Sequence, residues 1–167
     1  EPTPVVTVQP TESPTETPVS ELTVHFIDVG QADAAVLQCG DDTMMIDGGN
    51  VADSSLIVAY LKKLNIDNID YMVCTHAHED HVGGLSAPLS VMPVSAVYAP
   101  SAEADSKAYQ NFKRKAADQN TEIMHPENYE SFPFGSARVE ILACPDNADN
   151  LNNTSIILKV THKNKSF

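Results

Sequence analysis

The sequence predicts a layered α/β or α+β domain whose sheets carry helices on their outer faces. From residue 22 onward, short apolar runs separated by turn residues first follow one another directly and then alternate with amphipathic segments. Runs in direct succession predict antiparallel hairpins, whereas runs that alternate with helices predict parallel strands. The 167 residues suffice for one domain with a hydrophobic core of its own.

Residues 1–20 differ from the rest of the chain in composition. They hold five of the 11 prolines together with many Thr, Ser and Glu, and such a segment cannot bury enough apolar surface to offset its ordering entropy. We predict a linker or stalk over 1–20 and the folded domain over 21–167. The sequence opens without a methionine, so we expect a signal peptide or lipoprotein anchor upstream and an extracellular or cell-surface location in a bacterium. An interdomain linker would have the same composition.

The start of the domain carries three short apolar runs and then a helical pattern. The runs at 22–28, 34–39 and 43–46 predict strands, the last two joined by a turn. Asp53 and Ser54 can cap the helix that follows. Apolar positions recur in it at helical spacing: Ile57, Tyr60, Leu61 and Leu64. We expect this helix to cover the sheet.

The second half alternates strands with a further helix. Apolar runs at 71–75 and 94–98 predict buried strands, and 103–120 predicts a helix with one apolar stripe. Three more strands are predicted at 122–124, 137–142 and 155–160. Residues 163–167 resemble a turn that leads into a partner strand beyond them. Because native folds rarely leave a strand edge unpaired, we expect these residues to form the N-terminal portion of a larger domain.

The composition excludes several classes of protein. With 10 Lys and Arg against 23 Asp and Glu, the net charge is −13, so we expect no extended nucleic-acid-binding surface. No apolar run approaches the ~18 to 20 residues of a membrane-spanning helix, so no membrane span is predicted. Cys39, Cys74 and Cys144 lie in apolar runs and form no CxxC pair, which predicts buried thiols rather than disulfides or a thiolate metal site.

A cluster of metal-ligand residues follows the strand at 71–75: His76-Ala77-His78-Glu79-Asp80-His81-Val82-Gly83-Gly84. Imidazole and carboxylate groups are ligands for transition metals. Side chains two apart in an extended segment point the same way, so His76 and His78 can converge on one ion. Where the chain turns, Asp80 and His81 can face a second ion, and two ions about 3.5 to 4 Å apart would share a hydroxide and clamp a hydrolysed ester. We predict these four residues as metal ligands, and Asp80 also as a catalytic residue.

The element His76-x-His78-x-Asp80-His81, followed by two glycines, resembles the signature of the metallo-β-lactamase superfamily. Four further segments, 26–33, 45–49, 141–145 and 152–160, resemble the branch that includes the hydrolase domain of ComEC-type competence proteins and surface hydrolases such as phosphorylcholine esterases. The resemblance covers the chain from about residue 22 to its end. It implies an αββα sandwich, in which two sheets lie between helices, and a chain that stops before the second half of that sandwich.

Other polar residues gain expected roles beside this cluster. Asp47 ends a strand near the ligand loop, where a carboxylate can accept the second ring N–H of a ligand histidine and orient it; a plain turn acceptor is the alternative. Asp33 either organises the loop around it or reaches the cleft. The superfamily resemblance implies a further ligand histidine near 152–155, where this chain has asparagine, and we expect Asn153 to contact substrate or a metal-bound water. The resemblance places the remaining ligands past Phe167.

Ligand types and resemblance together predict a metal-dependent hydrolase. The expected cofactor is zinc, two ions in the full domain, with manganese as the alternative because ligand types overlap. The expected substrate is a small-molecule or polymer ester, and the reaction is phosphodiester or phosphoester hydrolysis by a metal-bound hydroxide. From these 167 residues alone we expect weak metal binding and negligible turnover. Two alternatives stay open: a surface-tethered binding or scaffolding domain with a degenerate metal site, and, less favoured, a lactamase or thioester hydrolase.

Overall fold

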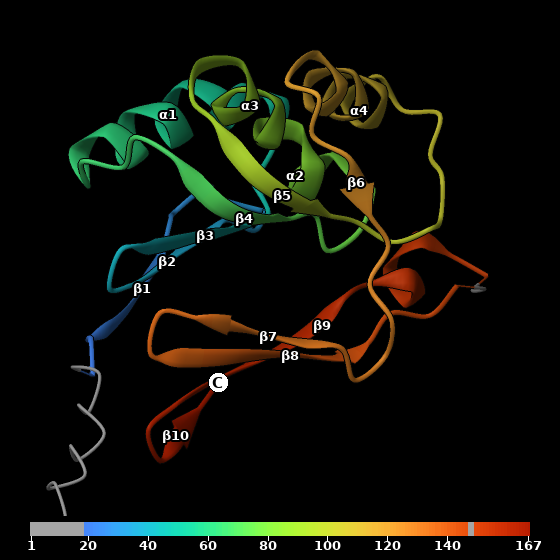
Figure 1. Ribbon diagram of the computed structural model, residues 1–167. Helices are drawn as coiled ribbons and strands as arrows, with labels where there is room; N and C mark the ends of the chain where they lie inside the picture. Colours follow the sequence, from blue (N-terminus) through green and yellow to red (C-terminus); the bar gives the residue numbers. More distant parts are fainter. Residues whose placement is uncertain (1–18, 147–148) are drawn as a thin grey trace, which may run out of the picture.

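The computed structural model describes residues 19–146 and 149–167, which form a layer of helices, a six-stranded sheet and a four-stranded sheet (Figure 1). The large sheet has the order β1-β2-β3-β4-β5-β6. Its strands are β1 (Leu22–Phe26), β2 (Ala35–Cys39), β3 (Asp42–Ile46), β4 (Ile69–Val73), β5 (Val94–Tyr98) and β6 (Ile123–Met124). The first three strands pair antiparallel, and β3 to β6 pair parallel. The carboxyl ends of β3, β4 and β5 therefore share one edge of the sheet.

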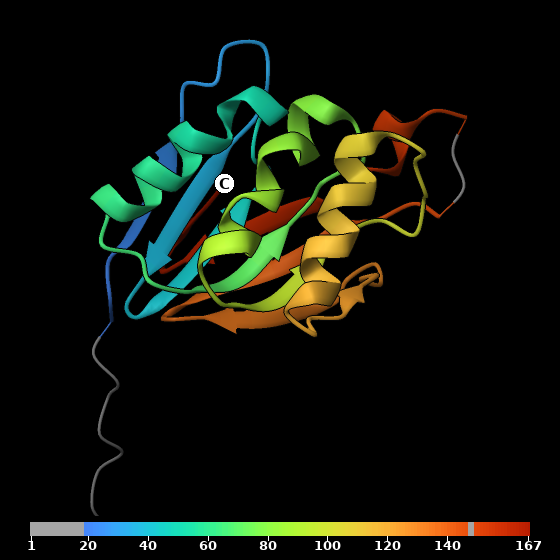
Figure 2. The same ribbon diagram turned by 90° about the horizontal axis from the view of Figure 1, so that it is seen from above.

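Helices cover the face of this sheet that points away from the second sheet (Figures 1 and 2). They are η1 (Val51–Asp53), α1 (Ser54–Lys63), α2 (Glu79–Val82), η2 (Gly83–Ser86), α3 (Pro88–Val91) and α4 (Lys107–Asp118). The predicted helices correspond to α1 and α4, and the predicted stripe of α4, Tyr109, Phe112 and Ala116, is buried. The chain enters α1 through η1, where Asp53 accepts a hydrogen bond from the backbone N–H of Asn50.

The second sheet is antiparallel, with the order β10-β9-β8-β7. Its strands are β7 (Ser131–Phe134), β8 (Ala137–Ala143), β9 (Ile157–His162) and β10 (Lys165–Ser166), and η3 (Leu151–Thr154) precedes β9. The expectation that the partner strand of β9 lies wholly beyond the last residue is wrong. The chain turns at Lys163 and β10 pairs with β9, and Phe167 exchanges backbone hydrogen bonds with Val160.

Neighbouring residues of the central strands build two separate cores because successive side chains of a strand point to opposite faces. Val36, Met45 and Met72 pack under the helices, whereas their neighbours Leu37, Met44 and Val73 pack between the sheets. Both faces of the central strands are therefore buried, and the predicted layered class is confirmed. The three cysteines are buried and free, as predicted. Across residues 19–146 and 149–167, no helix is long and apolar enough to cross a membrane.

Several polar contacts join the two sheets, and those of Ser20 lie at the start of the domain. The Ser20 carbonyl accepts hydrogen bonds from the Ser136 hydroxyl (3.1 Å) and from His162 Nε2 (2.8 Å). Ser20 immediately precedes the large sheet, while Ser136 and His162 belong to the β7–β8 turn and to β9. The start of the domain is thus fastened to the second sheet.

Candidate metal centre

The histidine cluster lies at the shared carboxyl edge of the parallel strands. The loop after β4 carries His76 and His78, and α2 carries Asp80 and His81. Asp47 follows β3, whose last residue pairs with the last residue of β4. Parallel pairing therefore brings Asp47 next to the loop, although 28 residues separate it from Thr75.

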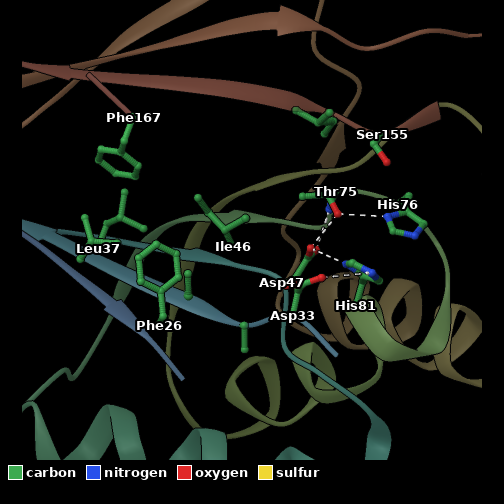
Figure 3. Close-up of a pocket in the computed structure, with 14 residues that line it drawn as sticks. Phe26, Asp33, Leu37, Ile46, Asp47, Thr75, His76, His81, Ser155 and Phe167 are labelled. Atoms are coloured by element: carbon green, nitrogen blue, oxygen red, sulfur yellow. Dashed lines mark hydrogen bonds and ion pairs between the residues drawn. The ribbon is translucent and has the colours of Figure 1, made fainter. Parts of the chain in front are cut away.

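Asp47 is the polar anchor of the centre (Figure 3). It is only 3% exposed, and its carboxylate accepts three hydrogen bonds. The donors are the Thr75 backbone N–H (2.8 Å), the Thr75 hydroxyl (2.6 Å) and His81 Nδ1 (2.8 Å). Its φ of 55° lies in the left-handed region, which Asp tolerates better than most residues. The geometry agrees with the expected role of Asp47 in orienting a histidine.

Thr75 extends this anchoring to a second histidine, which the sequence did not predict. Its hydroxyl donates to Asp47, so its oxygen is free to accept from His76 Nδ1 at 3.1 Å. Both His76 and His81 then carry their proton on Nδ1 and present the lone pair of Nε2. The signal available in the sequence was the position of Thr75, directly before the first histidine at the end of a strand.

The pKa values of the two anchored rings are shifted in opposite directions. The hydrogen bond from His81 to Asp47 raises the pKa of His81 above the ordinary value. Burial, and next the positive charge of His81, lowers the pKa of His76. His76 is therefore the more firmly neutral imidazole, which is the form that binds a metal ion.

His76 and His78 bring ring nitrogens together. The distance from His76 Nε2 to His78 Nδ1 is 3.1 Å. Zinc–nitrogen bonds of about 2.0 to 2.1 Å in a tetrahedral site place two donor nitrogens about 3.3 Å apart. The pair therefore fits joint coordination of one divalent ion in both distance and donor chemistry.

Asp33 and Asp80 lie at the outer side of the cluster. The Asp33 carboxylate is 76% exposed and 3.6 Å from His81 Nε2, and its backbone N–H donates to the Asp80 carbonyl. Asp33 thus holds the loop by its backbone and lines the cleft, and its contact with substrate or water stays a prediction. The charge of the half-buried Asp80 partly opposes the burial that lowers the pKa of His76, and it adds to the effect of Asp47 in raising the pKa of His81.

The described residues do not gather their His, Cys, Asp and Glu side chains into any group of three or more that could hold a metal ion. The rings meet in pairs instead, with centroids 4.9 Å apart for His76 and His78 and 4.0 Å apart for His76 and His81. The set of four ligands, His76, His78, Asp80 and His81, stays a prediction.

Asparagines reach the centre from the second sheet, but through Asn152 rather than Asn153. Asn152 Oδ1 lies 3.0 Å from His78 Nδ1, whereas the Asn153 carboxamide donates to Asp149. Both residues belong to η3, whose turn points neighbouring side chains in different directions. The expected contact of Asn153 with substrate or water stays a prediction.

Close backbone contacts fix the loop against the end of β3. The Gly48 N–H donates to the His81 carbonyl at 2.7 Å, and the Gly84 N–H donates to the Gly49 carbonyl at 3.1 Å. A Cβ on Gly84 would lie 1.9 Å from the Gly48 oxygen. Glycines are required here because the two backbones touch.

A cleft of about 380 Å³ opens beside these residues, between the two sheets (Figure 3). At one end Asp33, Asp47, His76 and His81 line it. At the other end its wall is apolar and includes Phe26, Leu37, Ile46 and Phe167. His76 and His81 therefore face the space in which a molecule could bind.

The family model of the metallo-beta-lactamase superfamily matches residues 27–134, well over half of the chain and the whole histidine cluster. The chain belongs to the metallo-beta-lactamase superfamily. Members of this superfamily are mostly metal-dependent hydrolases that bind divalent metals, often zinc. No curated protein matches the sequence significantly.

Solved structures of the superfamily share the fold at low sequence identity. A metallo-beta-lactamase with the HARLDQ motif from Cronobacter sakazakii is 18% identical, with 78% of this chain covering 52% of that one at a TM-score of 0.56. The metallo-beta-lactamase fold protein YhfI from Bacillus subtilis is 15% identical, with coverages of 87% and 59% and a TM-score of 0.58. CmlA, a diiron beta-hydroxylase from Streptomyces venezuelae, is 17% identical, with coverages of 90% and 29% and a TM-score of 0.54.

These matches confirm the predicted fold class of the metallo-beta-lactamase superfamily. The chain spans about half the length of the first structures that it matches. Because those structures include lactamases and a hydroxylase, a shared fold does not select the substrate.

Proposed function

We propose that the protein is a metal-dependent hydrolase that cleaves phosphodiesters or related phosphoesters, with zinc as the metal and manganese as the alternative. The observation that carries the proposal is the pair of ring nitrogens, His76 Nε2 and His78 Nδ1, which lie 3.1 Å apart, with His76 also lining the cleft. Lone pairs at this separation repel each other unless a proton or a cation lies between them. The ligand chemistry favours a transition-metal cation.

The remaining residues orient the histidines and shape the space around the bound ion. A bound divalent ion supplies a water activated at neutral pH and positive charge for the oxygens of the ester. Asp47 and Thr75 hold His76 and His81 in one tautomer and one orientation. The apolar wall of the cleft limits the access of bulk water to one side of the centre.

The preference for phosphoesters rests on the resemblance of 26–33 and 152–160 to ComEC-type and phosphorylcholine esterase sequences. Asparagine also takes the place near η3 at which that resemblance implies a histidine for lactamases and thioester hydrolases. On these grounds we propose that the protein belongs to the ComEC-type branch.

A second candidate is a binding or scaffolding domain that has lost catalysis. It is favoured by the pairwise meeting of the rings, since the described part of the chain gathers no three His, Cys, Asp or Glu side chains into a metal-binding group. The same metal titration decides between the two candidates.

The test uses the protein encoded by the complete gene. Titration with Zn²⁺ or Mn²⁺ in a calorimeter should show binding that His76→Ala weakens by about tenfold or more. His125→Ala, which changes an exposed histidine outside the loop, should leave binding unchanged. The loaded protein should hydrolyse bis(p-nitrophenyl) phosphate faster than the β-lactam nitrocefin. No metal binding would establish the binding module, and the reverse order of substrates would refute the phosphoester preference.

A further inference from the structure

His78 Nδ1 has two polar neighbours that no single proton can satisfy. His76 Nε2 lies 3.1 Å from it, and Asn152 Oδ1 lies 3.0 Å from it. Asn152 comes from η3, 74 residues further along the chain, so the long-range packing of the second sheet creates this contact.

The protons around these atoms can be assigned in turn. His76 Nδ1 donates to Thr75, so His76 Nε2 carries a lone pair. A carboxamide oxygen only accepts. A proton on His78 Nδ1 could bond to one of its two neighbours and would leave the other contact without a hydrogen. A cation shared by all three atoms satisfies every one of them.

We propose that Asn152 Oδ1 is the third protein donor to the metal ion held by His76 Nε2 and His78 Nδ1. The inference rests on the proposed function, in which these two histidines bind a metal. Among the described residues, His78 is the hydrogen-bond partner of the Asn152 carboxamide. The Asn152 carbonyl accepts from the backbone N–H and the hydroxyl of Ser155, which fixes the backbone at this position.

A donor set of two imidazoles and one carboxamide differs chemically from three imidazoles. An amide oxygen is a harder ligand than an imidazole nitrogen and suits Mn²⁺ better than nitrogen does. The centre should therefore discriminate less strongly between zinc and manganese. The donor set also explains why the histidine pair lacks a third His, Cys, Asp or Glu: its third member is an amide.

The experiment titrates the complete protein and three variants with ZnCl₂ and MnCl₂ in a calorimeter. Asn152→Ala should weaken metal binding by about tenfold or more, and Asn152→Asp, which keeps an oxygen donor, should bind at least as tightly as the parent. Asn164→Ala, an exposed asparagine on the β9–β10 turn, is the matched control and should bind as the parent does. Circular dichroism checks that each variant is folded.

A second readout separates coordination from a hydrogen bond. In ¹⁵N NMR of the zinc-loaded parent, His78 Nδ1 should have the shift of a metal-bound nitrogen and carry no proton. An Asn152→Ala variant that binds both metals as tightly as the parent would overturn the inference while leaving the proposed function intact, whereas a protonated His78 Nδ1 in the zinc-loaded protein would overturn both. Undiminished binding by His76→Ala would overturn both.

Discussion

The candidate metal centre has two sides that are built differently. On the inner side, His76 and His81 are anchored by hydrogen bonds to Thr75 and Asp47, and Asp47 is 3% exposed. On the outer side, Asp33 is 76% exposed and meets His81 at 3.6 Å. The comparison teaches that the inner side belongs to the folded core, whereas the outer side adds chemistry without adding stability.

The largest loss of stability on the inner side is expected when one methyl group is added between the backbones of Gly84 and Gly48. A Cβ at position 84 would lie 1.9 Å from the Gly48 oxygen, so Gly84→Ala should lower the free energy of unfolding by about 3 kcal/mol. Urea denaturation with a chelator present measures it. Gly30→Ala is the control, because a Cβ there meets nothing within 4 Å and its left-handed φ alone should cost about 1 to 2 kcal/mol. Equal losses would contradict the close-contact explanation.

A smaller loss is expected from the buried anchor. Asp47→Asn keeps the shape of the side chain but turns an amide toward donors: either the Thr75 backbone N–H, which bonds to Oδ1, or the Thr75 hydroxyl and His81 Nδ1, which share Oδ2. One buried donor then lacks an acceptor, and the free energy of unfolding should fall by about 2 kcal/mol. Asp41→Asn, at an exposed turn, removes the same charge and should have little effect. If the two variants unfold at the same urea concentration, Asp47 is not an anchor.

The smallest effect is predicted on the outer side. Asp33→Asn should change the free energy of unfolding by less than about 0.5 kcal/mol, because an exposed ion pair at 3.6 Å contributes little. The same urea experiment measures it. A loss above about 1 kcal/mol would show that the two sides are alike.

Periodicity and turn residues were enough to predict most of the fold. The runs at 94–98 and 137–142 became β5 and β8 with little change in their bounds. The strand β7 was missed because Pro133 lies inside it, and proline ordinarily argues against a strand. It is tolerated because β7 is the edge of its sheet. Edge position depends on the whole topology, so local sequence does not reveal it.

The centre could be predicted only where its residues are close in sequence. The spacing of the histidines and the strand end at Asp47 indicated a shared location, and the structure brings them together. Thr75 and Asn152 were missed for different reasons. The role of Thr75 depends on the rotation of a hydroxyl toward Asp47, and that of Asn152 depends on how the second sheet docks. A short motif encodes neither the rotation of the Thr75 hydroxyl nor the docking of the second sheet.

The Ser20 carbonyl, which accepts from Ser136 and His162, has a mechanical consequence. When a force pulls on the chain before Ser20, these two hydrogen bonds are loaded before the hydrogen bonds of β1. The load then divides between the two sheets instead of peeling β1 away from β2. The strand pair that leads to Asp33 is therefore shielded from tension at the start of the domain.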